Sequence, residues 1–192
     1  MAHAVRKIRE NVVNGVNIDH LAETIQSIKA NPELARFKFR ASTKWLGGAQ
    51  TETRIQGFYG AGREDSSRRK AFILEADEPH SLLGANHGPS ALETFLHSIA
   101  SSLAAGFAYR AASENVRIDS LDFKVEGEID LRGFLGVSSA IRPGYRSIRV
   151  TYKVRCDAPK EKVVEICDYV QKTSPLLDML RFPVSFSVEM EG

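Results

Sequence analysis

The sequence has little cysteine, little net charge and no long hydrophobic run. Its 192 residues include two cysteines, too few for a disulfide scaffold, so we expect a reducing compartment. The 26 Lys and Arg residues are balanced by 24 Asp and Glu, and no basic block stands out, so we expect no nucleic-acid partner. Because 43% of the residues are hydrophobic, the chain can bury a core, which excludes disorder as its main state.

Neither a membrane span nor a targeting segment is evident. The longest apolar stretch without a formal charge runs from Thr94 to Tyr109 and contains His and Ser. It is shorter than the roughly 20 residues that cross a bilayer, so it is expected to be a buried helix. The N-terminus carries charges but lacks the apolar core of a signal peptide. We therefore expect no membrane partner and a cytoplasmic location.

Hydrophobic spacing predicts the elements of the first half of the chain. Apolar residues three and four apart over 18–30 predict an amphipathic helix that ends at Asn31-Pro32. Alternation of apolar and polar residues predicts three strands, over 36–45, 50–58 and 71–77. Gly47-Gly48 is typical of a hairpin turn between the first two strands, whereas the polar stretch 59–70 is expected to be a mobile loop.

The second half centres on a helix expected over 90–115. This segment is apolar on nearly every side and rich in small residues, which predicts burial and the close approach of another backbone. Strands are expected over 121–131 and 148–156, and the opposite charges on their exposed faces favour pairing. A helix over 159–173 and a last strand over 184–188 follow. Because strands occur in runs joined by short turns, the fold class is α+β with antiparallel sheets.

The element order and three sequence blocks resemble the OsmC/Ohr family of thiol-dependent peroxidases and their relatives. The blocks are GPSALE at 88–93, LHSIASSLAAGFAYRAA in the long helix, and KTSPLLDMLRFPVSF near the end. The match covers about residues 35–190, so we expect an N-terminal extension with an amphipathic helix over 1–34 and an OsmC-like domain over 35–192. The resemblance implies antiparallel sheets around central helices, in an intertwined homodimer with active sites at the subunit interface.

The resemblance also implies where a peroxidase site would lie. In the family's peroxidases one cysteine attacks the hydroperoxide, a second resolves the sulfenic acid, and a glutamate and an arginine activate the first thiol. Matching Pro89 and Glu93 places the attacking position at Ser102 and the resolving position at or near Ser174, with Arg54 the nearest candidate for the arginine. Because a serine hydroxyl ionises far less readily than a thiol and forms no sulfenate, we do not expect the family's peroxidase cycle.

Several of these residues also have structural explanations. Glu93 completes a capping box with Ser90, either alone or together with a role in the site. Cys156 and Cys167 lie on apolar faces, where cysteine is usually inert, and Cys167 is the stronger redox candidate because its helix carries the family's resolving residue. No G-x-S-x-G motif surrounds Ser102, so a role as a hydrolase nucleophile is not expected. As a small residue, Ser102 is expected instead to permit close helix packing.

The histidines match no zinc-binding spacing. His80, His87 and His97 lie near Glu93 in the sequence, but only His97 shares a helix with that carboxylate. We therefore predict no metal site and no cofactor.

Three functions are compatible with these observations. The first is an OsmC-like homodimer without the family's peroxidase activity, whose interface pocket binds a small apolar ligand through Phe95, Phe107 and Tyr109. The second is a thiol peroxidase that reduces organic hydroperoxides through Cys167 or Cys156. The third is a non-catalytic scaffold for a partner protein.

Overall fold

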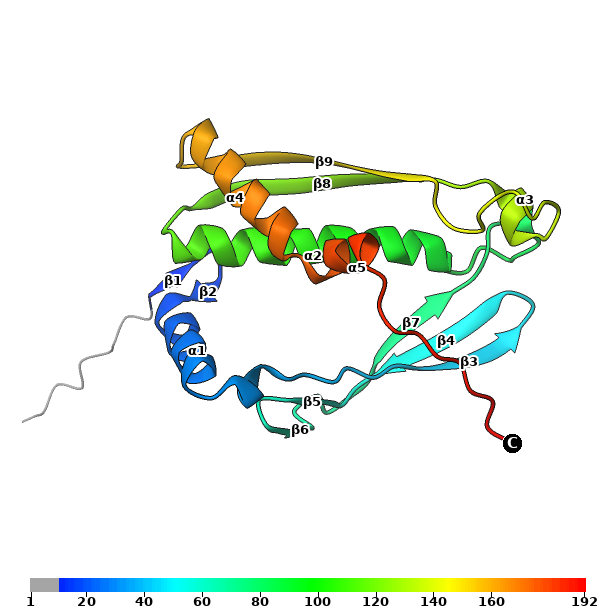
Figure 1. Ribbon diagram of the computed structural model, residues 1–192, viewed down its shortest axis with the longest axis horizontal. Helices are drawn as coiled ribbons and strands as arrows, with labels where there is room; N and C mark the ends of the chain where they lie inside the picture. Colours follow the sequence, from blue (N-terminus) through cyan, green and yellow to red (C-terminus); the bar gives the residue numbers. More distant parts are fainter. Residues whose placement is uncertain (1–10) are drawn as a thin grey trace, which may run out of the picture. The chain divides into compact units, whose positions relative to one another are not determined.

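The computed structural model describes residues 11–192, which form two compact units (Figure 1). The N-terminal unit comprises Asn11 and Asn17–Phe95, and the C-terminal unit comprises Val12–Val16 and Leu96–Gly192. The first ten residues of the extension expected over 1–34 lie outside the described residues, and the domain boundary at residue 34 stays a prediction.

The N-terminal unit combines a helix with a three-stranded sheet. Helix α1 (Ile18–Ala30) has the predicted bounds, and it begins at Asn17, whose side chain accepts a hydrogen bond from the His20 backbone N–H at 2.9 Å. A short 3₁₀ helix, η1 (Pro32–Ala35), follows. The antiparallel sheet has the order β3-β4-β7, with strands Ser42–Gly47, Gln50–Ile55 and Phe72–Ala76. The φ angles of Gly47 and Gly48, 135° and 55°, explain the predicted glycine turn between β3 and β4.

Two predictions for this unit were wrong in part. The strand predicted over 36–45 begins only at Ser42, and the residues before it pair with a neighbour at one bridge, between Lys38 and Tyr59. The expected loop over 59–70 instead contains most of a second hairpin, made of β5 (Phe58–Gly60) and β6 (Arg63–Asp65). Two consecutive residues with positive φ form its tight turn, and the polar composition of the segment concealed it.

The C-terminal unit places a long helix against an antiparallel ribbon. Helix α2 (Ala91–Ser113) begins in the N-terminal unit and runs through the C-terminal one, where β8 (Ile118–Glu128) and β9 (Ser147–Cys156) lie along it (Figure 1). The register sets Glu126 opposite Arg149 and Asp122 opposite Lys153, so the strand pairing expected from the opposite charges is confirmed. The β8–β9 connection carries the short helix α3 (Leu131–Phe134).

A small hairpin is fastened to this unit by one side chain. Strands β1 (Val12–Val13) and β2 (Val16–Asn17) flank a turn that contains Asn14. The Asn14 amide donates a hydrogen bond to the Val116 carbonyl at 2.8 Å and accepts one from the Ile118 N–H at 2.9 Å. The hairpin is thereby held to the loop between α2 and β8.

The core of the C-terminal unit lies between α2 and α4 (Lys160–Thr173). The buried side chains of these helices recur at helical spacing, at Ile99, Leu103, Phe107 and Ala111 on α2 and at Val163, Ile166, Cys167 and Val170 on α4. A Cβ added to Gly106 would lie 3.0 Å from Val170 Cγ1, so the glycine permits this close packing. Part of the small-residue surface of α2 is therefore covered by the chain's own α4, whereas Ser101 and Ala105 stay exposed.

The end of the chain differs from the prediction. Helix α5 (Pro175–Arg181), which was not predicted, follows α4 directly, with Ser174 as its N-cap. The strand expected over 184–188 is wrong for this chain, because within residues 11–192 no strand pairs with the segment. Its alternating apolar side chains are exposed instead, with Phe186 at 87% and Val188 at 82%. Among the residues that the structure describes, no helix is long and apolar enough to cross a bilayer.

Candidate functional site

Helices α2 and α5 bring Ser102 and Ser174 together. Their hydroxyl oxygens lie 3.0 Å apart and share a hydrogen bond, although the residues are 72 positions apart in the sequence. Ser174 is buried and also accepts a hydrogen bond from the Leu177 N–H as the N-cap of α5. The two positions that the resemblance assigns to the attacking and resolving cysteines are thus in contact, and their role in a reaction stays a prediction.

Glu93 forms the predicted capping box at the start of α2. The backbone N–H and hydroxyl of Ser90 donate to its Oε2 at 2.8 and 2.9 Å, and the Glu93 N–H donates to the Ser90 hydroxyl at 3.3 Å. These hydrogen bonds, that of the Ser90 backbone first, lower the pKa of Glu93 below its ordinary value. Glu93 and the exposed Arg54 belong to the N-terminal unit, whereas Ser102 and Ser174 belong to the C-terminal unit. The capping box therefore explains the position of Glu93 without a catalytic role.

Asp77 is a buried carboxylate that no sequence motif indicated. It accepts hydrogen bonds from the backbone N–H groups of Glu78, Ala85 and His87 at 2.8, 3.0 and 3.1 Å. These bonds lower its pKa, although burial opposes the shift. The carboxylate thereby organises the loop between β7 and α2, which contains the 3₁₀ helix η2 (His80–Leu82).

A partly open cavity of about 310 Å³ lies in the C-terminal unit, between three helices and the β8–β9 ribbon. Its lining is mostly aliphatic and aromatic, from Leu103, Phe107, Phe123, Ile148, Val150, Tyr152, Cys167, Val170, Gln171 and Leu177. None of these side chains carries a formal charge, and the polar groups are a phenol, a thiol and an amide. The volume lies at the lower end of the range for small-molecule sites, roughly 300–1,000 Å³.

Of the three aromatic residues expected to hold a ligand, only Phe107 lines this cavity. Phe107 is buried, whereas Tyr109 is 56% exposed, because two residues along a helix turn a side chain by about 200°. Phe95 lies on α2 within the N-terminal unit. Tyr152 also lines the cavity, and the alternation of apolar residues over 148–156 was the signal that could have identified it.

Cys167 supplies the thiol of the cavity wall. It is buried and hydrogen-bonded to the Tyr152 hydroxyl. Burial raises the pKa of Cys167, and the hydrogen bond from Tyr152 lowers it by less. The same hydrogen bond, with burial, raises the pKa of Tyr152 to about 12. A thiol with a raised pKa is mostly protonated near neutral pH and is therefore a poor nucleophile.

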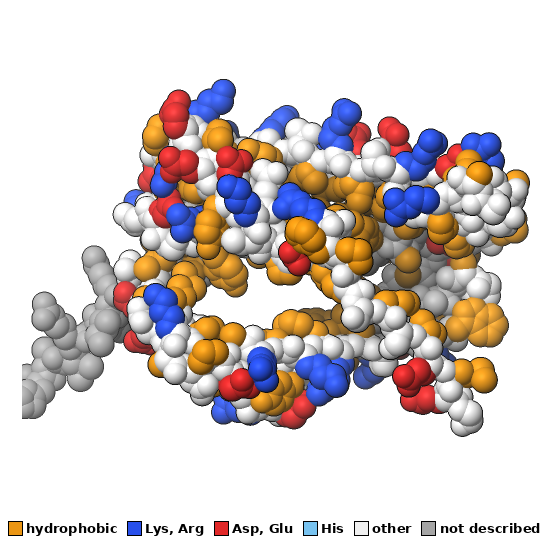
Figure 2. Space-filling view, viewed as in Figure 1, with side chains coloured by type: hydrophobic (Ala, Val, Ile, Leu, Met, Phe, Trp, Pro, Cys, Tyr) orange, Lys and Arg blue, Asp and Glu red, His pale blue; other side chains and the backbone are white. Residues whose placement is uncertain are grey.

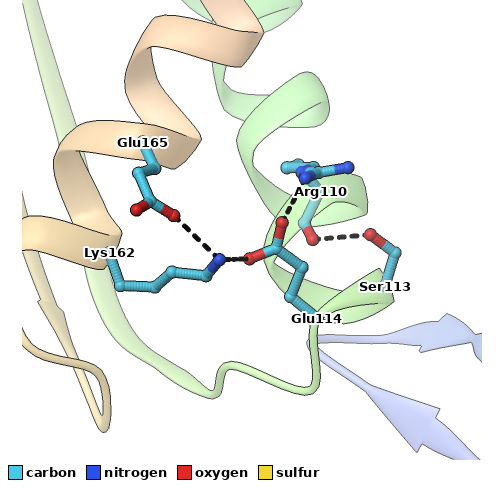
Figure 3. A network of polar contacts seen from close by, with 5 residues as sticks. All are labelled: Arg110, Ser113, Glu114, Lys162 and Glu165. Carbon is cyan, nitrogen blue, oxygen red and sulfur yellow. Dashed lines mark hydrogen bonds and ion pairs between the residues drawn. The ribbon is translucent and has the colours of Figure 1, made fainter.

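An ionic network ties the end of α2 to the start of α4 (Figure 3). Glu114 lies between Arg110 and Lys162, with an ion pair to each, and the Lys162 Nζ lies 2.6 Å from Glu114 Oε2. Lys162 also pairs with Glu165 at 3.0 Å, and the Arg110 guanidinium lies 4.2 Å from the Tyr169 ring centroid. The network therefore fixes two helices that wall the cavity.

The histidines are engaged separately. His80 lies 3.0 Å from the Gly84 carbonyl, His87 lies 2.7 Å from the Gln50 amide, and His97 lies 3.3 Å from the Ser101 hydroxyl. Within residues 11–192 no group of three His, Cys, Asp or Glu side chains is placed to hold a metal ion.

The C-terminal unit consists of a long helix beside an antiparallel ribbon, and two serines are in contact at the side of that helix. This arrangement is α+β, the fold class that the resemblance implied. A sequence model described as OsmC-like protein matches residues 84–189, more than half of the chain. The chain therefore belongs to the OsmC-like family, which confirms the resemblance. No curated protein sequence matches it.

Solved structures confirm the fold class. An OsmC-like protein from Mycoplasma pneumoniae aligns with a TM-score of 0.58 at 17% identity, over 75% of this chain and 87% of that one. An organic hydroperoxide resistance protein from Legionella pneumophila gives 0.52 at 10% identity, over 75% and 89%. An OsmC-like protein from Vibrio cholerae gives 0.52 at 11% identity, over 73% and 92%. At these identities the likeness establishes the fold alone.

Proposed function

We propose that this protein binds a small neutral apolar molecule in the cavity of its C-terminal unit and lacks the peroxidase activity implied by the family resemblance. The observation that carries the proposal is a cavity of about 310 Å³ without a charged lining residue. The resemblance places the two sulfurs of the peroxidase cycle at position 102 and at or near position 174, and the serines there support the second half of the proposal.

The chemistry of the lining selects the ligand class. A carboxylate or phosphate in this partly open cavity would lose part of its hydration without gaining a cation, which is unfavourable. A neutral ligand loses far less, and the Tyr152 hydroxyl and the Gln171 amide offer it hydrogen bonds. An apolar molecule with one neutral polar group therefore fits best.

A peroxidase based on Cys167 is the weaker alternative. Its raised pKa leaves little thiolate to attack a hydroperoxide. Cys156, the other free cysteine, is not part of the cavity lining, and its thiol donates a hydrogen bond to the Ala158 carbonyl at 3.8 Å. The cavity therefore offers no second thiol to resolve a sulfenic acid.

Filling the cavity is expected to abolish ligand binding. N-phenyl-1-naphthylamine is a neutral fluorescent probe, and 8-anilinonaphthalene-1-sulfonate has nearly the same skeleton with a negative charge. We expect saturable binding of the neutral probe, weaker binding of the sulfonate, and a loss of at least about tenfold in Val150→Phe, because the added ring occupies the cavity.

The control variant is Val164→Phe, the same substitution on α4 at a side chain that is 46% exposed. It should leave the affinity for the neutral probe unchanged. Equal loss in both variants, or tighter binding of the sulfonate, would contradict the proposed ligand class.

Peroxide turnover is expected to be absent. With dithiothreitol as reductant, the protein should consume cumene hydroperoxide no faster than its Cys156→Ser/Cys167→Ser variant, because neither family position carries a sulfur. Peroxide loss in a coupled or colorimetric assay provides the measurement. Turnover that disappears in Cys167→Ser alone would support the thiol peroxidase instead.

We also propose that the protein is a homodimer. Its C-terminal stretch exposes a row of apolar side chains, at Phe182, Val184, Phe186, Val188 and Met190. Contiguous exposed apolar surface of this kind marks an interface. Light scattering coupled to size exclusion should give about twice the chain mass of 21.3 kDa. A mass near that of one chain at micromolar concentration would refute the dimer.

A further inference from the structure

The β1–β2 hairpin turns through Asn14-Gly15, the only Asn-Gly pair in the sequence. The φ angles of the two residues, 53° and 77°, are both positive, which is the conformation that a tight hairpin turn requires and that Asn-Gly favours. Gly15 is exposed, and a Cβ built on it would have no heavy atom within 4 Å. The turn therefore explains the pair, but the same pair is chemically labile.

An asparagine that precedes a glycine is prone to deamidation. The backbone nitrogen of the glycine attacks the side-chain carbonyl carbon of the asparagine, a C–N bond forms, and the amide nitrogen leaves as ammonia with the proton of the glycine N–H. Water then opens the resulting succinimide at either carbonyl, which gives aspartate or isoaspartate. Glycine favours the attack because it has no side chain to shield its nitrogen. The only co-reactant is water, so the reaction requires neither an enzyme nor a free protein surface.

Backbone groups hold both polar atoms of the Asn14 side chain in the folded protein. Its Nδ2 donates to the Val116 carbonyl at 2.8 Å, and its Oδ1 accepts from the Ile118 N–H at 2.9 Å. These two bonds direct the amide toward the loop between α2 and β8, and turning its carbon onto the Gly15 nitrogen breaks them. The attack therefore requires an open form of the hairpin.

Little else holds the hairpin closed. Each of its strands has two residues, and Val13, which is 7% exposed, is the one buried side chain between Asn11 and Asn17. Figure 2 shows hydrophobic side chains where β1, β2 and the C-terminal end of α2 lie together in Figure 1. Short segments with few buried contacts open locally while the rest of the fold stays intact. The hairpin is therefore expected to open without unfolding of the C-terminal unit.

We propose that Asn14 is a deamidation site at which opening of the hairpin becomes irreversible. Both products carry a carboxylate in place of the amide, so position 14 has no N–H left to donate to the Val116 carbonyl. Closing the hairpin would bring a negatively charged oxygen against that carbonyl oxygen, which is unfavourable. The converted hairpin therefore stays away from the loop between α2 and β8.

The first test follows conversion of Asn14 in the full-length protein by peptide mapping and mass spectrometry, in mildly alkaline buffer with and without urea. Conversion in buffer should be about tenfold to a hundredfold slower than in urea, because two hydrogen bonds and a buried valine favour the closed form. Val13→Ala should raise the rate in buffer by about fivefold and leave the rate in urea unchanged. Asn86, an exposed asparagine with a φ of 57° that precedes histidine, is the internal control and should keep its amide.

Three outcomes of this test would overturn the proposal. Equal rates with and without urea would show that the hydrogen bonds of Asn14 do not control its reaction. A rate in buffer that Val13→Ala does not raise would show that conversion does not pass through hairpin opening. Conversion of Asn86 as fast as that of Asn14 would show that the Asn-Gly pair has no special reactivity.

The second test measures whether the carboxylate releases the hairpin. Asn14→Asp introduces it with the backbone unchanged, and Asn115→Asp is the matched control, at an exposed residue with a φ of 56° in the loop between α2 and β8. Hydrogen exchange of the Ile118 N–H should be about tenfold faster in Asn14→Asp and within about twofold of the parent in Asn115→Asp. Unchanged exchange in Asn14→Asp would overturn the proposal, as would an equal rise at Leu103 in α2, which would indicate global unfolding.

Discussion

The double variant Ser102→Cys/Ser174→Cys is expected to form an intramolecular disulfide when treated with one equivalent of cumene hydroperoxide. The two hydroxyl oxygens already lie 3.0 Å apart, and a disulfide requires the two sulfurs to approach to about 2.05 Å. Serine and cysteine are nearly isosteric, so each substitution is expected to change stability by less than about 1.5 kcal/mol. The experiment uses the Cys156→Ser/Cys167→Ser background, so that the introduced thiols are the only ones that can react.

The expected reaction has two balanced steps. The thiolate introduced by Ser102→Cys attacks the terminal peroxide oxygen, the O–O bond breaks, and the alkoxide leaves and takes up a proton, while the sulfur becomes a sulfenic acid. The thiol introduced by Ser174→Cys then attacks the sulfenic sulfur, the S–S bond forms, and water leaves. Thiol titration should show both thiols consumed, and the mass of the single chain should fall by two hydrogens.

Single variants separate the two steps. Ser102→Cys alone should accumulate a sulfenic acid that dimedone traps, because Ser174 provides no resolving sulfur. Ser174→Cys alone should be labelled less, since the resemblance gives that position the resolving role. If dimedone labels Ser102→Cys no more than it labels Cys156 or Cys167 in the unmodified protein, the assignment of Ser102 to the attacking position is wrong.

The sequence was most informative where a local signal and the fold agree. Asn31-Pro32 was expected to end the helix over 18–30, and α1 ends at Ala30, because termination depends on neighbouring residues only. The pairing of β8 with β9 was also predicted from the sequence, because charges of opposite sign occupy facing positions on the two strands. Local chemistry was sufficient for both.

The features that the sequence did not predict depend on contacts between residues far apart in the sequence, or on a neighbour that the described residues do not supply. The alternation over 184–188 is that of a strand, but a strand requires a neighbour, and within residues 11–192 none pairs with it. The contact between Ser102 and Ser174 was not missed, but it was implied only by the family resemblance, because no local pattern encodes the approach of the two segments. The resemblance selected both positions, whereas their distance required the packing of α2 against α4 and α5.

The same distinction separates Phe107 from Tyr109. Both are aromatic residues of one apolar helix, so composition offered no means of ranking them. Phe107 is 1% exposed and lines the cavity, whereas Tyr109 is 56% exposed. Substitution of each by alanine is therefore a direct test of how the C-terminal unit is packed.

Phe107→Ala is expected to reduce the free energy of unfolding by about 3–5 kcal/mol, the usual range for a buried phenylalanine. Tyr109→Ala, the matched control on the same helix, should change it by about 0.5 kcal/mol, as exposed positions typically do. Urea unfolding followed by circular dichroism measures both values. Because the removed ring enlarges the cavity, the folded fraction of Phe107→Ala should also bind larger neutral aromatic compounds than the parent protein binds. Equal destabilisation by the two substitutions would show that α2 does not bury Phe107 against β8, β9 and α4, and the cavity assigned to the ligand would then be wrong.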